Sequence, residues 1–174
     1  DAEVPDHTDA ILERSISFHF QSGGIYENRR NRREARYIAE QVRGLLARET
    51  GMSIGIVAFS EAQQGEIESA LNRLGEADED FRRRLAEEFE REEDGQFCGL
   101  FVKNLENVQG DERDVILFSL GYGPDARGRV SMNFGPLNQK GGERRLNVAI
   151  TRATTEVVIF CSFDPAVIDL TRTQ

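Results

Sequence analysis

The chain has 174 residues, of which 39% are hydrophobic and 30% are charged, and its net charge is −9. This length and composition predict one soluble domain with its own core, and no apolar run approaches the ~20 residues of a membrane helix. The acidic balance argues against a broad electropositive surface for nucleic acid. Cys98 and Cys161 lie in apolar runs and are expected to be buried free thiols. No signal-peptide pattern follows Asp1, so a cytoplasmic location is expected.

The first part of the chain alternates strand and helix patterns. Residues 1–14 are expected to form a poorly packed, flexible edge, and residues 15–174 to form the domain. Apolar and polar residues alternate over 16–20, which predicts a half-buried strand. Apolar residues at helical spacing predict a helix over 32–49, and the apolar run at 54–59 predicts a strand buried on both faces.

The rest of the chain continues this alternation. The further predicted elements are a helix around 67–74, a helix over 78–93, strands over 97–102 and 115–120 with a polar connection between them, a long loop over 121–142, a short helix, a strand over 157–161 and a terminal helix from about 164. This order predicts an α/β fold with a parallel sheet and helices on both faces. Ligands of such folds bind at the carboxyl ends of the strands, where we expect the loop after Phe59, Gln109–Gly110 and the short helix to meet.

The short helix predicted over 141–153 carries two arginines beside an apolar face. The apolar residues that share this face are Leu146, Ala149, Ile150 and Ala153. Arg145 and Arg152 lie two turns apart at its edge, so docking of the apolar face would fix both guanidinium groups. Such groups suit a phosphate, although an ordinary core helix with solvated arginines explains the spacing equally well.

The connection before the strand at 115–120 holds a second candidate site. Gly110 permits a positive φ angle or a close backbone approach, Gln109 offers a donor and an acceptor, and Glu112 can accept from a sugar hydroxyl. A plain polar turn is the alternative. Gln63 directly follows a buried strand, where it could hydrogen-bond a base, contact a neighbouring loop or simply face solvent.

The start of the first long helix is a third candidate. Asn31 is a suitable N-cap, and Glu34 stands three residues later, as in a capping box. Arg32 and Arg33 oppose the helix dipole there, a cost that a nearby anion would remove.

Groups that would complete a catalytic site are missing from the sequence. It has no G-x-x-x-x-G-K-[ST] phosphate loop and no strand that ends in an Asp-Glu pair for Mg²⁺. The two histidines, His7 and His19, both lie near the start, and no nucleophile arrangement is visible. The chain thus offers groups that stabilise an anion without the machinery on which they would act.

Four segments together resemble the second RecA-like domain of superfamily 1 helicases. Val108–Asp114 resembles helicase motif V, and Arg144–Ala153 resembles motif VI. Asn31–Ala35 is similar to an N-R-x-E-A element of the family, and Ile56–Gln63 is similar to motif IV. The similarity extends over residues 16–163 and is nearest to the nonsense-mediated-decay branch and to large bacterial helicase-related proteins.

The resemblance implies roles for single residues. Arg152 corresponds to the arginine finger on a γ-phosphate, and Arg32 to the family's other γ-phosphate arginine. Gly110 and Glu112 correspond to motif V positions near the phosphate and ribose. Gln109 corresponds to the glutamine that links the nucleotide and nucleic-acid sites. Arg145 is implied to support motif VI.

Contacts with nucleic acid follow less directly. Ser60, Gln63 and Asn133 are the candidate contact residues. The family often has Pro then Tyr or Phe where this chain reads Phe59-Ser60, so the stacking aromatic of motif IV is displaced or absent. The loop that contains Asn133 could contact the strand or brace motif VI, and we favour bracing.

The resemblance therefore implies the C-terminal motor domain of an ATP-dependent helicase acting on single-stranded DNA or RNA. ATP and Mg²⁺ would be held by an N-terminal RecA-like domain of the same parent chain, outside these residues, so the fragment alone is expected to be inactive. The alternatives are a non-catalytic nucleic-acid- or protein-binding module on a RecA-like scaffold and a stand-alone nucleotide-binding domain.

Overall fold

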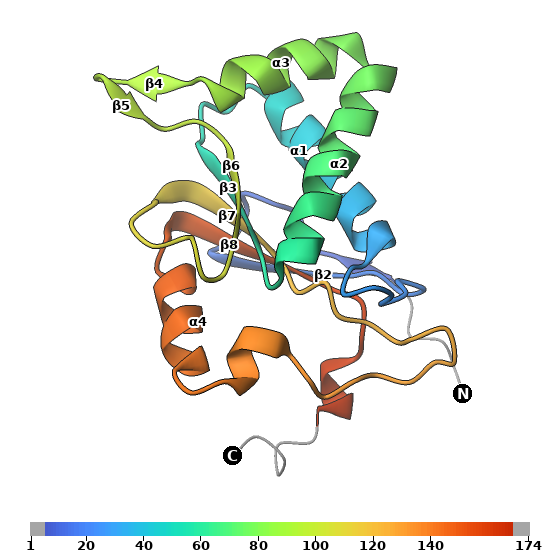
Figure 1. Cartoon of the computed structure of the whole chain (residues 1–174). Coiled ribbons are helices and arrows are strands. Elements are labelled where there is room, and N and C mark those ends of the chain that lie inside the picture. Colours follow the sequence, from blue (N-terminus) through green and yellow to red (C-terminus); the bar gives the residue numbers. More distant parts are fainter. Residues whose placement is uncertain (1–5, 169–174) are drawn as a thin grey trace.

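The computed structural model describes residues 6–168 as one α/β domain built on a six-stranded sheet (Figure 1). The strand order is β1-β2-β8-β7-β3-β6, and all neighbours are parallel except β1, which pairs antiparallel with β2. The strands are β1 (His7–Thr8), β2 (Ile16–Phe20), β3 (Ile54–Ala58), β6 (Phe101–Asn104), β7 (Arg113–Ser119) and β8 (Ala153–Cys161). A separate two-stranded ribbon pairs β4 (Glu92–Glu93) with β5 (Gln96–Phe97).

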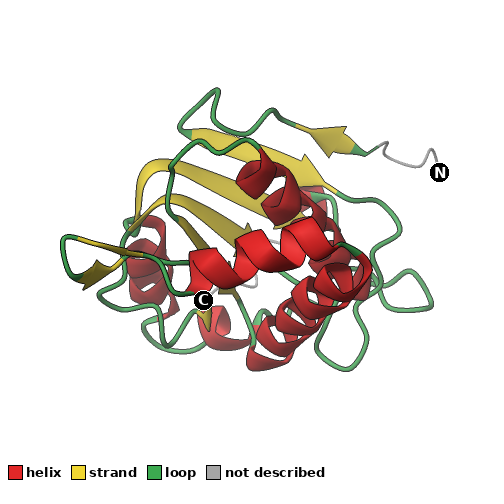
Figure 2. Cartoon of the chain, turned by 90° about the horizontal axis from the view of Figure 1, so that it is seen from above, coloured by secondary structure: helices red, strands yellow, loops and turns green. Residues whose placement is uncertain are grey.

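Helices lie on both faces of the sheet, but unequally. The helices are α1 (Arg32–Ala47), α2 (Glu61–Ala77), α3 (Glu79–Phe89) and α4 (Gly142–Ile150). Figure 1 shows α1, α2 and α3 together on one side and α4 alone on the other, and Figure 2 shows the first three in front of the strands. The predicted α/β class is confirmed.

Local sequence explains where the long helices begin. The side chains of Asn31, Ser60 and Asp78 each accept a hydrogen bond from the backbone N–H three residues ahead, which caps α1, α2 and α3. Helix α1 ends two residues before its predicted limit, and Gly51 follows with a φ of 75°. The first two caps lie beside the carboxyl ends of the strands and fix the start of α1 next to the start of α2.

The central strands carry the core. All five residues of β3 are buried, as the continuous apolar run predicts. The face toward α1 and α2 packs Ile38, Val42 and Ile67 on Ile56, while Val57 lies in the cluster on the α4 side. Strands buried on both faces leave little freedom for the loops at their ends, which carry the candidate site residues.

The predicted strand forms as β2, and its polar side chains are buried. Ser17 and His19 are fully buried, whereas Ile16, on the other side of the strand, is 62% exposed. The buried polar side chains are hydrogen-bonded, because Ser17 Oγ donates to the carboxylate of Glu156 and His19 Nδ1 lies 2.9 Å from Tyr37 Oη. Period-2 alternation locates the strand, but these partners from distant elements decide which side faces the helices.

Residues 6–14, expected to be poorly packed, are mostly exposed but make specific contacts with the rest of the domain. His7–Thr8 pairs with β2, Ile11 is only 6% exposed, and Asp9 accepts a hydrogen bond from the backbone N–H of Phe18 at 2.9 Å. Residues 1–5, which belong to the same prediction, lie outside the described residues.

Boundaries also differ from the prediction after α3 and at the C-terminus. Helix α3 ends at Phe89, and a turn with Asp94 and Gly95 in positive φ conformations then forms the β4–β5 ribbon, so the predicted strand starts later, as β6. The C-terminal helix expected from about residue 164 is a 3-10 turn, Pro165–Val167, within the described chain, and residues 169–174 lie outside it.

The prediction of buried free thiols is confirmed for Cys161 but not for Cys98. Both are free; Cys161 is buried and Cys98 half-buried. Burial raises the pKa of the Cys161 thiol to about 12. Within residues 6–168 no helix has the length and hydropathy needed to cross a bilayer.

Candidate functional site

Helix α4 is shorter than its sequence pattern predicts. It ends at Ile150, and Ala153 is the first residue of β8, so Arg152 lies in the turn between helix and strand. The backbone N–H of Arg113 donates to the carbonyl of Arg152 at 2.9 Å, which joins this turn to the start of β7. The predicted docking of one apolar face is only partly correct, because Ala149 is buried but Ile150 is 43% exposed.

The side chain of Arg152 folds back on the end of α4. Its Nε donates to the carbonyl of Val148 at 3.0 Å, and Nη2 donates to Thr151 Oγ1 at 3.2 Å. Nη1 lies 3.5 Å from Oε1 of Glu112, and the side chain is 19% exposed. The carbonyl end of a helix favours a cation, so the guanidinium group is oriented before any ligand arrives.

The connection whose residues resemble motif V runs from β6 back to the start of β7. Gly110 is exposed and has a φ of 89°, which agrees with the predicted positive φ angle, and a Cβ added there would meet no described atom within 4 Å. Gln109 is also exposed, and the side chain of Glu112 is 59% exposed. The connection therefore presents Gly110, Gln109 and the Glu112 carboxylate outward while Glu112 stays beside Arg152.

Buried contacts on the other side hold this connection in place. The guanidinium carbon of Arg113 lies 5.2 Å from the ring centroid of Phe97 and 5.0 Å from that of Phe101. Arg113 Nε donates to the carbonyl of Gly99 at 2.8 Å, and Lys103 pairs with Asp111 at 2.6 Å. Two cation–π contacts and an ion pair thus anchor the residues on both sides of Glu112.

Arg32 lies at the carboxyl ends of the parallel strands, the carboxyl edge of the sheet. Arg152 lies at their amino ends, the amino edge. Arg32 begins α1; its side chain is 69% exposed, and its Nε lies 4.0 Å from the Glu66 carboxylate. The seven residues of β7 separate the two edges by about 20 Å, at roughly 3.3 Å per residue. Arg32 and Arg152 therefore do not meet at one phosphate in this structure, and the expected cluster at the carboxyl ends is wrong.

Chain topology explains this separation. A helix that follows a parallel strand begins near that strand's carboxyl end, whereas a helix that precedes a strand ends near its amino end. Arg32 opens the helix after β2, and Arg152 follows the helix that precedes β8. Figure 1 shows the start of α1 and the end of α4 at opposite ends of the strands.

The carboxyl edge holds a buried polar network. Gln63 is fully buried; its Nε2 donates to Ser119 Oγ at 3.0 Å and to the carbonyl of Asn31 at 3.2 Å, and its Oε1 accepts from the Asn31 backbone N–H at 2.7 Å. The interpretation of Gln63 as a nucleic-acid contact is wrong, because its amide is buried and both of its N–H groups already have acceptors. Contact with a neighbouring loop, the alternative, is correct.

Glu34 is the centre of this network. Its carboxylate is fully buried and accepts hydrogen bonds from Ser119 Oγ at 2.6 Å, the Gly121 backbone N–H at 2.8 Å and Ser162 Oγ at 3.2 Å. Burial outweighs these donors and raises the pKa of Glu34 to about 7. Only half of the predicted capping box forms, since Asn31 caps the Glu34 backbone at 3.1 Å while the Glu34 carboxylate points into the network. Capping chemistry explains Glu34 locally, so nothing in the sequence pattern signals this second role.

The remaining candidates have local partners. Ser60 Oγ accepts from the Gln63 backbone N–H at 3.1 Å and donates to the carbonyl of Arg29 at 3.1 Å. Asn133 is exposed, and its Oδ1 accepts from the Gly135 backbone N–H at 3.1 Å. Arg145 Nη1 donates to the carbonyl of Pro136 at 3.3 Å, so this arginine joins α4 to the loop before it.

The amino edge brings together a cation, a carboxylate and an open stretch of backbone. Arg152 supplies an oriented cation, Glu112 an exposed acceptor, and Gly110 an open stretch of backbone. Within residues 6–168 no three or more His, Cys, Asp or Glu side chains are grouped so that they could hold a metal ion. These residues fit one side of a phosphate and a ribose.

Comparison with known proteins places this arrangement in a family. A family model described as "AAA domain" matches residues 7–164. The chain belongs to the AAA domain family. This AAA domain is 41% identical over 150 residues to an uncharacterized ATP-dependent helicase of Mycoplasma genitalium, a match that covers 85% of the chain. The homologous helicase of Mycoplasma pneumoniae is 40% identical over 139 residues, or 79% of the chain.

The AAA domain is a small part of these relatives. The matches cover 12% of the length of each Mycoplasma protein, so the domain is homologous to one segment of an ATP-dependent helicase. Among solved structures, the C-terminal domain of a possible DNA helicase from Lactobacillus plantarum WCFS1 is similar with a TM-score of 0.48 and 14% identity, covering 91% of this chain and 81% of that chain.

Proposed function

We propose that this AAA domain is the second RecA-like domain of a superfamily 1 helicase motor and that it supplies Arg152 to ATP held by another domain of the same polypeptide. The observation that carries the proposal is the 3.5 Å approach of Arg152 Nη1 to Glu112, which unites the motif VI and motif V residues at one edge. Homology to a segment of ATP-dependent helicases supports the same function.

The proposed role of Arg152 depends on the fixed orientation of its guanidinium group. Transfer of a phosphoryl group spreads negative charge over its oxygens, and an oriented arginine stabilises that charge. The bonds from Nε and Nη2 fix the plane of the guanidinium group, while the contact of Nη1 with Glu112 is long. An incoming phosphate can therefore take over Nη1 without a change in the bonds that orient the side chain.

Glu112 and Gly110 contribute to binding. The exposed Glu112 carboxylate can accept from a ribose hydroxyl, and the open backbone at Gly110 allows a nucleotide to approach closely. ATP supplies the phosphoryl group, and Mg²⁺ would be held by the domain with the phosphate loop. The 174 residues alone are then expected to lack ATPase activity, and single-stranded DNA or RNA is the proposed track of the complete motor.

The test uses the full-length parent protein with Arg152→Ala. Loss of an arginine finger is expected to reduce ATP turnover by about 10³- to 10⁵-fold while ATP binding remains. Arg129→Ala is the matched control, because Arg129 is exposed and pairs with Asp125 in its own loop. Turnover within a few-fold of wild type in Arg152→Ala would contradict the finger assignment. A wild-type parent that binds nucleic acid but shows no turnover would instead favour the non-catalytic binding module.

A further inference from the structure

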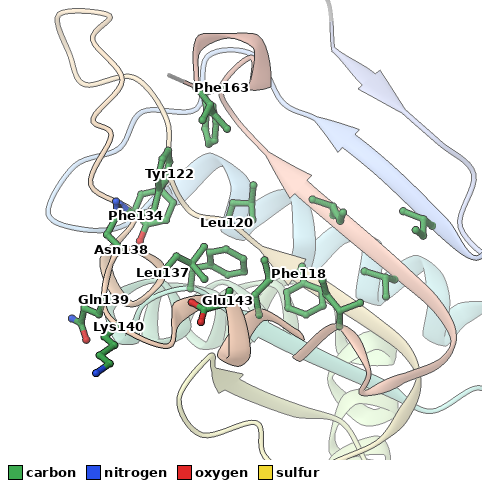
Figure 3. Close-up of a pocket in the computed structure, with 17 residues that line it drawn as sticks. Phe118, Leu120, Tyr122, Phe134, Leu137, Asn138, Gln139, Lys140, Glu143 and Phe163 are labelled. Carbon is green, nitrogen blue, oxygen red and sulfur yellow. Dashed lines mark hydrogen bonds between the residues drawn. The ribbon is translucent and has the colours of Figure 1, made fainter. Parts of the chain in front are cut away.

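An open apolar groove of about 840 Å³ lies between the sheet and α4. Phe118 and Ile159 from the sheet form its floor, and Leu146 and Ile150 from α4 and Leu137 from the preceding loop form its wall. Figure 3 shows Phe118, Leu120, Phe134 and Leu137 directed toward the same space. The described residues that line this groove include none of the proposed nucleotide-binding residues, so it is separate from the site described above.

The groove marks an uncovered part of the sheet. Parallel strands are normally covered by helices on both faces, since their side chains are apolar on both. Within residues 6–168, three α-helices cover one face, whereas the other has one α-helix, α4, of nine residues, together with side chains of the preceding loop such as Phe134 and Leu137. Ile16 of β2 is 62% exposed and Ile150 of α4 is 43% exposed, and both line the groove. Within the described residues, therefore, this face of β2 and β8 has room for a further helix.

We propose that an amphipathic α-helix of the same polypeptide, from the part of the parent protein outside these 174 residues, docks in this groove. The chain spans 12% of the length of its Mycoplasma relatives, so most of such a polypeptide lies outside the matched segment. Ile168, the last residue that the structure describes, is itself part of the groove wall. The described chain thus ends along this groove.

The groove has the chemistry of a helix site. Its interior is apolar, which suits side chains at i, i+3, i+4 and i+7 of one helix face. Lys140 and Glu143 at one border carry opposite charges that can pair with the polar side of such a helix. A second copy of the chain is a poorer occupant, because within residues 6–168 the three long helices already bury their apolar faces.

Two residues of α4 provide a matched test. Val148 and Ile150 are 39% and 43% exposed, but of the two Ile150 alone lines the groove. Single cysteines at these positions, in a Cys98→Ser background, are labelled with a maleimide in the 174-residue chain and in the full-length parent. We expect similar rates at both positions in the short chain. In the parent we expect Ile150→Cys to react at least about tenfold more slowly than Val148→Cys.

Each other result overturns the proposal. Equal rates at the two positions in the parent mean that no helix covers the groove. Protection of Ile150→Cys in a short chain that sediments as a dimer assigns the groove to a second copy, and protection in a monomeric short chain means that the chain closes the groove itself.

A second pair of variants keeps the test independent of labelling chemistry. Ile150→Asp is expected to lower the Tm of the parent more than Val148→Asp does, and both are expected to have similarly small effects on the short chain. Equal Tm changes in the parent would contradict the proposal. None of these readouts depends on ATP hydrolysis, so the proposed motor function can fail without affecting this inference.

Discussion

The polar residues are buried at one edge of the sheet and exposed at the other. At the carboxyl edge, Glu34 and Gln63 are fully buried, and both hydrogen-bond Ser119 at the end of β7. At the amino edge, Glu112 is 59% exposed, and one nitrogen of Arg152 makes a long contact with it. Both edges carry residues that resemble helicase motifs, so resemblance alone does not separate residues that hold the fold from residues that are free to meet a ligand.

The largest difference between the two edges is expected when the arginine of each edge is replaced by alanine. In the full-length parent, Arg152→Ala is expected to lose about 10³-fold or more in ATP turnover. Arg32→Ala is expected to change turnover less than about threefold, because Arg32 lies far from Arg152 and its exposed ion pair with Glu66 contributes little to stability. Steady-state turnover at saturating ATP checks both, with thermal unfolding to confirm that each variant is folded. Equal losses would mean that both edges serve one phosphate.

The next largest effect is on stability at the carboxyl edge. Gln63→Ala leaves Asn31 and Ser119 without their Gln63 partner and opens a cavity, so it is expected to lower the free energy of unfolding by about 3 to 5 kcal/mol. Gln109→Ala, the same change at an exposed position, is expected to stay within about 0.5 kcal/mol. Urea unfolding of the 174-residue chain measures both. A small effect of Gln63→Ala would show that the network is not structural.

The pH dependence of stability tests Glu34. Its pKa is about 7 in the folded state against an ordinary glutamate value of 4.5, so between these values the folded protein holds a proton that the unfolded chain releases. Stability is therefore expected to fall as pH rises through this window, by up to about 3 kcal/mol, and to level off above it. Below pH 4.5 both states are protonated, and the penalty disappears.

Glu34→Gln isolates this contribution. The variant is expected to lose this part of the pH dependence, while Glu40→Gln, on the same helix but exposed, keeps it. Urea unfolding of the three proteins at about pH 5 and pH 8 gives the comparison. If the difference between wild type and Glu34→Gln is the same at both values, the folded-state pKa of Glu34 is not raised.

The smallest expected effect belongs to Glu112. If it accepts from a ribose hydroxyl, Glu112→Gln in the parent should raise the KM for ATP by about three- to tenfold and leave kcat nearly unchanged, because the amide oxygen still accepts the hydrogen bond but no longer carries a charge. A deoxyribose form of ATP should remove the difference between wild type and variant. A large fall in kcat would instead indicate that Glu112 orients Arg152 during turnover.

Local pattern was enough for most of the fold. The apolar run at 54–59 predicted a strand buried on both faces, and the helical spacing of Ala35, Ile38 and Val42 predicted α1 with its buried side. A capping residue marked the start of α1. These predictions succeed because each depends on interactions within a few residues or on burial of one face, which the sequence period records directly.

The sequence by itself determined the class of fold and the residues that could meet an anion. It could not determine which of them do, because Arg32 and Arg152 look alike in sequence, and only the crossing direction of α1 and α4 over the parallel strands puts them at opposite edges. Likewise, Ser17, Glu34 and Gln63 are polar residues whose burial depends on Glu156, Ser119 and Ser162, all far along the chain. Tertiary structure decided these points, because a polar group is buried only where partners from distant segments satisfy its hydrogen bonds.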